Sequence, residues 1–102
     1  MAFIIVYITY PNIEEANKII SHLINKKLIA CANIFPVKSS FIWKGKVDNS
    51  DEIVSIAKTK KENWEKIKAE VKKMHSYETP CILKIEAEAN EDFEDWVNKE
   101  TE

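Results

Sequence analysis

The chain has 102 residues, of which 45% are hydrophobic and 31% are charged, and its formal net charge at pH 7 is −2. These values suit one globular domain over residues 1–102, and no apolar run approaches the ~20 residues of a membrane span. All fifteen basic residues are lysines. The absence of arginine argues against a nucleic-acid or nucleotide-phosphate clamp, because arginine is the usual bidentate ligand of phosphate and guanine. The N-terminus lacks a basic region followed by a small-residue cleavage site, so we expect a cytoplasmic protein.

The first element is the β-branched and aromatic run Ala2–Tyr10, which is apolar on both alternating faces. This pattern predicts a strand that is covered on both sides. Asn12 and Glu15 are spaced as a capping pair, which predicts that a helix begins there. Apolar residues at steps of three and four extend the helix to about Asn25. Its predicted inner stripe consists of Ile13, Ala16, Ile20 and Leu23, and the same spacing reaches Lys27.

The stretch Leu28–Val47 predicts two extended pieces, Leu28–Ile34 and Ser40–Val47, with a bend at Pro36. Proline cannot donate to a central ladder and therefore marks an edge or a bulge. Alternation assigns Phe41, Trp43, Gly45 and Val47 to one face and Ser40, Ile42, Lys44 and Lys46 to the other. The stretch is longer than one small domain needs, so we expect it to reach a second chain.

The turn-forming residues Asp48–Asp51 predict a hairpin between Val47 and a further strand, Glu52–Lys58. Thr59 and Glu62 are spaced as a second capping box, which predicts a helix from there to about Met74. The predicted inner stripe of this helix consists of Trp64, Ile67, Val71 and Met74.

An irregular segment, His75–Pro80, then leads to a fourth predicted strand, Cys81–Ala87. Asn90 can cap a last helix, Glu91–Lys99. That helix is expected to bury Phe93, Trp96 and Val97.

This element order predicts a ferredoxin-like α+β sandwich, βαββαβ with a C-terminal helix, in which an antiparallel sheet carries both main helices on one face. The first strand is apolar on both faces, yet the two helices cover only one. We therefore expect the uncovered face to meet another copy of the chain.

Several polar residues are candidates for a ligand site. His75, Tyr77 and Glu78 either converge at the lip of a pocket or only fix the turn that leads into the fourth strand. Lys58, on an otherwise apolar strand face, either extends to solvent or meets an anion. Trp43 is interpreted as core or interface, with a stacking platform as the alternative. His22 is expected to be solvated.

Cys31 and Cys81 are interpreted as reduced, buried, structural residues. With His75 they could form a soft metal set, but no CxxC or HxxxH spacing supports it.

The sequence also lacks a glycine-flanked serine, and its single glycine nearly excludes a phosphate-cradling loop. An acylphosphatase-like enzyme and an RNA-binding domain share the element order, but the first needs an arginine and the second a basic-aromatic strand signature.

Four segments together resemble the CutA divalent-cation tolerance family: LIACANI at 28–34, SFIWKGKV at 40–47, KT at 58–59 and HSYETPCI at 75–82. The resemblance implies a cytoplasmic homotrimer whose hairpin strands pair across subunits, a link to copper and other divalent cations, and no enzymatic activity. The trimer would be similar to that of the PII proteins, which bind small effectors between subunits.

In bacterial CutA proteins copper is assigned to a cysteine on the first strand and a histidine pair. Here those positions are Ile8 and Met74-His75, so only His75 transfers as a metal ligand, with Met74 as a soft sulfur donor.

The leading interpretation is therefore a homotrimeric, non-enzymatic copper or divalent-cation response protein, with no nucleic-acid or membrane partner. The alternative is a PII-like sensor that binds a small effector between subunits. The predicted ligand cleft consists of Cys31, Trp43, Lys58, His75, Tyr77 and Glu78, with His75 as the metal ligand.

Overall fold

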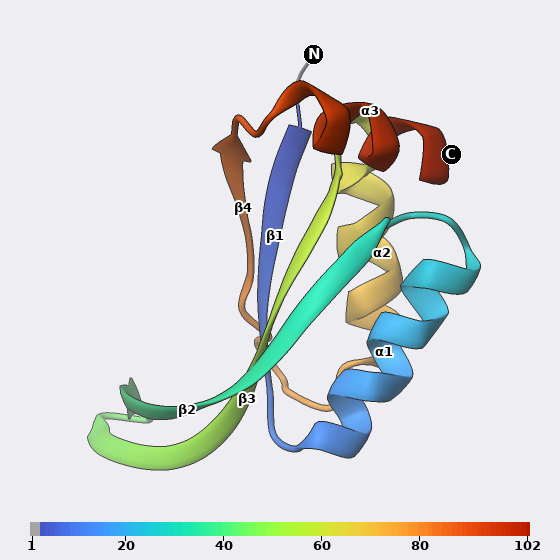
Figure 1. Ribbon diagram of the computed structural model, residues 1–102. Helices are drawn as coiled ribbons and strands as arrows, with labels where there is room; N and C mark the ends of the chain where they lie inside the picture. The colour runs from blue at the N-terminus through green and yellow to red at the C-terminus, as the bar shows by residue number, and fades with distance from the viewer. Residues whose placement is uncertain (1–2) are drawn as a thin grey trace.

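The computed structural model describes residues 3–102, which form one antiparallel sheet and three α-helices (Figure 1). In chain order the elements are β1 (Phe3–Tyr10), α1 (Ile13–Asn25), β2 (Cys31–Trp43), β3 (Lys46–Lys60), the 3-10 turn η1 (Lys61–Asn63), α2 (Trp64–Met74), β4 (Ile82–Ala87) and α3 (Glu91–Glu100). The sheet order is β2-β3-β1-β4, and every neighbouring pair is antiparallel. Both α1 and α2 lie on one face of the sheet, whereas α3 lies across one end (Figure 1). The predicted ferredoxin-like α+β fold is confirmed. Within the described residues, no helix is both long enough and apolar enough to cross a bilayer.

The hydrophobic core lies between β1 and the two main helices. The residues of β1 that point to the helices are fully buried: Ile4, Val6, Ile8 and Tyr10. They pack in one cluster with apolar residues from α1, such as Leu23, and from α2, such as Ile67. The buried hydroxyl of Tyr10 lies 2.7 Å from the Ser55 hydroxyl of β3, so this polar atom is satisfied inside the core.

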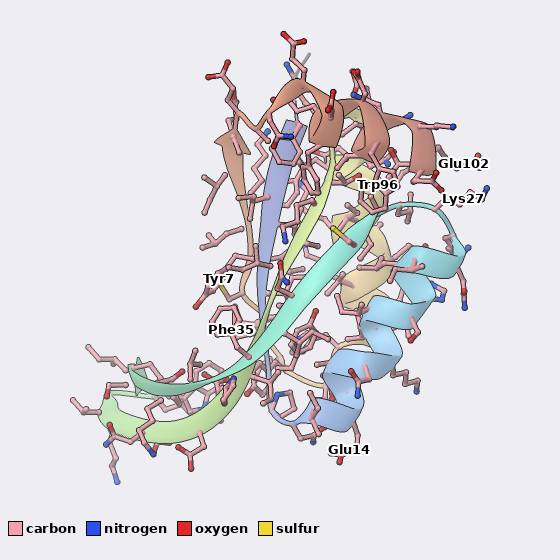
Figure 2. All side chains as sticks on the ribbon, in the orientation of Figure 1. Tyr7, Glu14, Lys27, Phe35, Trp96 and Glu102 are labelled. Atoms are coloured by element: carbon pink, nitrogen blue, oxygen red, sulfur yellow. The ribbon has the colours of Figure 1, made fainter. Side chains whose placement is uncertain are left out.

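The opposite face of the sheet, which we call the open face, is also apolar in its middle. Ile5 and Tyr7 of β1 are half-buried there, in register with Ile85 and Leu83 of β4, which are about half exposed. Figure 2 shows the side chains of Tyr7 and Phe35 on the side of the sheet away from α1 and α2. β1 therefore presents apolar side chains to both faces of the sheet, and the helices α1 and α2 cover one of them (Figure 1).

The helix α1 begins and ends close to the predicted residues. Asn12 caps it, because its Oδ1 accepts a hydrogen bond of 2.8 Å from the Glu15 amide. The predicted inner stripe is wrong at its start, since Ile13 is exposed and Ile19 is buried instead. Ile13 is the first residue of the helix, before the first turn has brought the stripe onto the sheet.

The hairpin between β2 and β3 turns earlier than predicted. The turn consists of Lys44 and Gly45, both at positive φ (50° and 80°), which matches the two-residue hairpin turns that favour glycine. Asp48–Asp51 therefore lies inside β3, where Asp51 is in register with Lys38. Polar residues are tolerated in this strand because the outer half of the hairpin is exposed to solvent.

The shifted turn also changes which residues share a face of the hairpin. Val47 lies directly opposite Ile42, so it does not share a face with Trp43 as predicted. The pairing continues without interruption through Pro36, which is opposite Ile53. Proline is accommodated because β2 is an edge strand. Figure 1 shows that the outer half of the hairpin curves away from the rest of the sheet.

The capping box predicted at Thr59–Glu62 is wrong. The strand β3 continues to Lys60, and α2 begins only at Trp64, after the 3-10 turn. The Thr59 hydroxyl donates to the Leu28 carbonyl oxygen at 2.6 Å. The Asn63 side-chain amide donates both to this carbonyl oxygen and to the Thr59 hydroxyl oxygen, at 3.2 Å each. These side chains are therefore used to join β3 to the loop that precedes β2.

The helix α3 departs from its prediction in two respects. Asn90 makes no side-chain cap, and the Glu94 carboxylate instead accepts a hydrogen bond of 2.7 Å from the Ala89 amide. Trp96 is partly exposed, whereas Val97 is buried and Phe93 packs edge-on against Phe3 with 6.1 Å between ring centroids. The helix covers only the end of the sheet, so one side of it remains in solvent (Figure 1).

A polar cluster joins α1 to α2 and corrects the interpretation of His22. Its Nε2 lies 2.7 Å from Glu70 Oε1, so His22 is not simply solvated. The Lys73 ammonium group donates to the other carboxylate oxygen, Glu70 Oε2, at 3.0 Å. The ammonium nitrogen of Lys26 lies 3.8 Å from Glu70 Oε1. The hydrogen bonds from His22 and Lys73 lower the pKa of Glu70 from 4.5 to about 2.

We expect Glu70 to contribute to acid stability. A carboxyl group whose pKa is lowered by folding stabilises the protein above its ordinary pKa, and this contribution is lost as pH falls from about 4.5 to about 2. Urea denaturation from pH 6 to pH 2.5 should therefore show a steeper loss of stability in the wild type than in Glu70→Gln. Parallel loss in both proteins would show that the cluster does not stabilise the fold.

Candidate functional site

A groove of about 750 Å³ opens where the curved hairpin faces the segment between α2 and β4. Its charged lining residues are all acidic: Asp48, Glu52 and Glu78. Its aromatic lining residues are Phe41, Trp43 and Tyr77, and the remainder are Thr9, Ser39, Ser40, Ile42, Ser50, Ser76, Thr79 and Cys81. The groove therefore combines aromatic surface with negative charge, and no lysine lines it.

The structure brings only half of the predicted cleft together. Trp43, Tyr77 and Glu78 line the groove, and Glu78 has no hydrogen-bonding or ionic partner among the described residues. Cys31 and Lys58 lie elsewhere on the open face, directly opposite each other in β2 and β3. The Lys58 ammonium group donates to the Asn33 side-chain carbonyl, so it does not enter the groove.

Trp43 occupies the tip of the hairpin and is partly exposed. The Lys44 ammonium nitrogen lies 5.8 Å from the centroid of its indole ring. That distance is within the range of a cation–π interaction. The ring is thus not part of the core of this chain.

Glu52 is a site residue that the sequence interpretation missed. It is largely buried, and its carboxylate accepts a hydrogen bond from the Tyr77 hydroxyl. Burial and then the hydrogen bond to this carboxylate raise the pKa of Tyr77 above its ordinary value. The sequence signal was available, since Glu52 shares a strand face with Val54 and Ile56, the same face on which Lys58 stands.

His75 borders this region but does not line the groove. Its side chain is fully buried, and its ring stacks on Tyr10 with 5.6 Å between centroids and an interplanar angle of 13°. Nε2 lies 2.7 Å from the Thr9 carbonyl oxygen, and Nδ1 accepts from the Tyr77 amide at 3.1 Å. Glu15 Oε2 is 3.3 Å from Nδ1 and also accepts from the Ser76 amide at 3.0 Å.

The residues around His75 do not fit the copper site that the family resemblance implies. Both imidazole nitrogens have protein partners, and a metal would have to displace one of them. The described residues contain no cluster of three or more His, Cys, Asp or Glu side chains that could hold a metal ion. Ile8 is buried on the helix side of β1, and Met74 packs against the core. This arrangement gives His75 a structural role that needs no metal.

Cys31 and Cys81 are both half-buried and free within the described chain. Burial raises the pKa of each thiol; Lys58 opposes the increase at Cys31, and the charge of Glu52 adds to it at Cys81. A raised pKa keeps a cysteine protonated and unreactive. The geometry is thus compatible with structural thiols.

We expect Cys31→Ala and Cys81→Ala each to reduce the free energy of unfolding by about 1 kcal/mol through lost packing. Chemical denaturation under reducing conditions measures this loss, and metal titration of the same variants provides the control. A variant that loses metal binding but keeps its stability would assign that thiol to a metal site.

Comparison with known proteins identifies the family. The model of the CutA1 divalent ion tolerance proteins matches residues 4–100. The divalent-cation tolerance protein CutA of Archaeoglobus fulgidus is 47% identical over 98 residues, which are 95% of this chain and 96% of the relative. A solved structure from the same organism, described as a periplasmic divalent cation tolerance protein CutA, has a TM-score of 0.95 and 46% identity over 98% of this chain and 99% of that chain.

A second solved structure is described as the PII-like protein CutA from Nostoc sp. PCC 7120 in apo form. It has a TM-score of 0.90 and 28% identity, and the match covers 100% of this chain and 98% of that chain. The matches extend over both halves of the sheet and all three helices. On this basis the chain belongs to the CutA1 divalent-ion tolerance family.

Proposed function

We propose that this protein is a homotrimeric, non-enzymatic response protein that binds a divalent cation, with copper as the cation that the family resemblance implies. The acidic groove carries this proposal, because its charged lining residues are three carboxylates and no lysine. Carboxylate oxygens attract divalent cations, and the aromatic wall keeps part of the site out of water. No nucleophile–base pair lines the groove to suggest a reaction.

The trimer is supported by the apolar surface that a single chain leaves uncovered. Ile42 and Val47, opposite each other near the hairpin tip, are each 76% exposed. The open face adds Leu83 and Ile85, and the outer edges of β2 and β4 have no partner strand in the described chain. An interface that covers these surfaces should bury more than ~2,000 Å², as obligate interfaces do.

The cation site would be completed by the assembly. A single chain presents no cluster of three donors among its described residues, so a cation held by Glu52 or Glu78 would need further donors from water or from a neighbouring copy. The two free cysteines are consistent with the reducing cytoplasm that we also propose.

Isothermal titration of copper, zinc and magnesium into the purified protein tests cation binding. We expect Glu52→Gln/Glu78→Gln to weaken binding by about tenfold or more, because two carboxylates of the groove lose their charge. Glu91→Gln/Glu100→Gln is the matched control, since it removes the same charge from α3, at the other end of the molecule from the hairpin tip (Figure 1). Equal affinities in both variants would place the cation outside the groove.

A second candidate function is a sensor of a small organic effector. It is favoured by the aromatic wall of Phe41, Trp43 and Tyr77 and by the structural likeness to the PII-like CutA of Nostoc. Trp43 provides the readout, because a ligand that stacks on its ring should quench its fluorescence. The quenching should disappear in Trp43→Phe, whereas a signal that persists would come from Trp64 or Trp96.

A further inference from the structure

The segment 75–81 crosses from α2 to β4 and forms one wall of the groove. Figure 1 shows it passing near the end of β1 and the start of α1. Side-chain contacts fix its first three residues: Glu15 accepts from the Ser76 amide, and the His75 ring contacts both Thr9 and Tyr77. The segment has no regular secondary structure, so these contacts determine the position of the wall.

The partners of His75 define its tautomer. The Thr9 carbonyl can only accept a hydrogen bond, so Nε2 at 2.7 Å must carry a proton. The Tyr77 amide can only donate, and at 3.1 Å it meets a lone pair on Nδ1. Glu15 Oε2 lies 3.3 Å from the same nitrogen, and this oxygen already accepts from the Ser76 amide at 3.0 Å. With Nε2 donating and Nδ1 accepting, the ring uses both nitrogens, one toward β1 and one toward the groove wall.

The ring has little freedom to leave this arrangement. It is fully buried, stacked on Tyr10 on one side, and 4.9 Å from the Tyr77 ring by centroid distance. Tyr10 is itself held by its contact with Ser55 inside the core. The imidazole therefore connects a rigid part of the core to the amide of Tyr77.

We propose that His75 is a positioning residue and not a metal ligand: its neutral imidazole holds the Tyr77 backbone on the end of β1, so that the Tyr77 hydroxyl reaches Glu52 in the groove. The geometric role is independent of the proposed function. Its consequence for binding in the groove rests on that function. His75, the residue that the family resemblance implies as a copper ligand, would then support the wall of the groove without binding the metal.

The first experiment observes the imidazole nitrogens directly. The chain has two histidines, so ¹⁵N-histidine labelling gives two rings, and His22→Gln assigns them. At pH 7 the His75 ring should show a protonated Nε2 and an unprotonated Nδ1. Addition of Zn²⁺, which is diamagnetic, should leave both His75 resonances unchanged. A large shift of either nitrogen on zinc binding, or the opposite tautomer, would overturn the proposal.

The second experiment separates positioning from packing. In His75→Asn the side-chain oxygen replaces Nδ1 and can still accept from Tyr77, whereas in His75→Gln the side-chain amide replaces Nε2 and can still donate to Thr9. Hydrogen exchange at the Tyr77 amide should therefore accelerate about tenfold more in His75→Gln than in His75→Asn. The amide of Val6 in the core is the reference for global stability.

A merely structural histidine would accelerate exchange at Tyr77 and Val6 together, equally in both variants, and that result would overturn the proposal. The two proposals fail independently. A wild-type protein that binds no cation would contradict the proposed function but would leave the tautomer and the exchange pattern as tests of His75.

Discussion

Replacement of both Leu83 and Ile85 by lysine is expected to reduce the mass in solution threefold, from the trimer that we propose to the 11.8-kDa single chain. The two side chains are 49% and 51% exposed and stand on β4, opposite Tyr7 and Ile5 on the open face. Two ammonium groups in an apolar interface must either be desolvated without partners or hold the copies apart. Because the copies in the proposed homotrimer have identical sequences, every copy would carry the same defect.

The matched control is Ile13→Lys/Ile24→Lys on α1. These residues are 41% and 43% exposed, so they have nearly the same solvent contact, but they lie on the helix layer and not on the open face. Sedimentation equilibrium at micromolar concentration should find this control trimeric. If Leu83→Lys/Ile85→Lys also remains trimeric while folded, the open face is not the interface that we propose.

The order of helices and strands could be predicted from the sequence because each element is indicated by a local residue pattern, and the tertiary packing does not override these patterns. The run Phe3–Tyr10 is apolar in both phases of the alternation, and only a central strand with two apolar faces satisfies that pattern. Asn12 stands directly before the first residue of α1 and caps the helix as expected. In these cases the local preference and the global fold agree.

The hairpin turn was mispredicted because two local signals competed. Asp48–Asp51 is a stronger cluster of turn formers by composition than Lys44-Gly45. The outer hairpin, however, is exposed on both faces, so polar residues carry little penalty in a strand there. The short turn with two residues at positive φ then determines the register, since glycine adopts that conformation without strain.

The environment of His75 could not be predicted from local sequence. Its partner Thr9 is 66 positions away, and Tyr77 reaches Glu52 across 25 positions. Only the packing of α2 against β1 and α1 creates these contacts, and it also buries the ring. Two residues of the motif around His75, Tyr77 and Glu78, do line the groove, but the local sequence could not show that the His75 ring is buried behind them.

The second large effect is expected at Ile8, the residue that stands where the resemblance implies a copper-binding cysteine. Its side chain is fully buried beneath the helices, between Ser55 of β3 and Ile82 of β4. Ile8→Ala removes three buried carbons and leaves a cavity that the surrounding strands cannot close, so we expect a loss of about 2–5 kcal/mol in the free energy of unfolding. Urea denaturation at fixed protein concentration measures it, because the stability of an assembly depends on concentration.

Ile8→Val is the matched control and should cost only about 0.5–1.5 kcal/mol, since it removes one methyl group from the same site. Ile8→Cys tests the metal role separately. Successive residues of a strand point to opposite faces, and Thr9, the next residue, lines the groove. A cysteine at position 8 would therefore face the core, and copper affinity should not increase. A gain in copper binding by Ile8→Cys would show that a metal can enter between β1 and the helices, and would bring His75 back into consideration as its ligand.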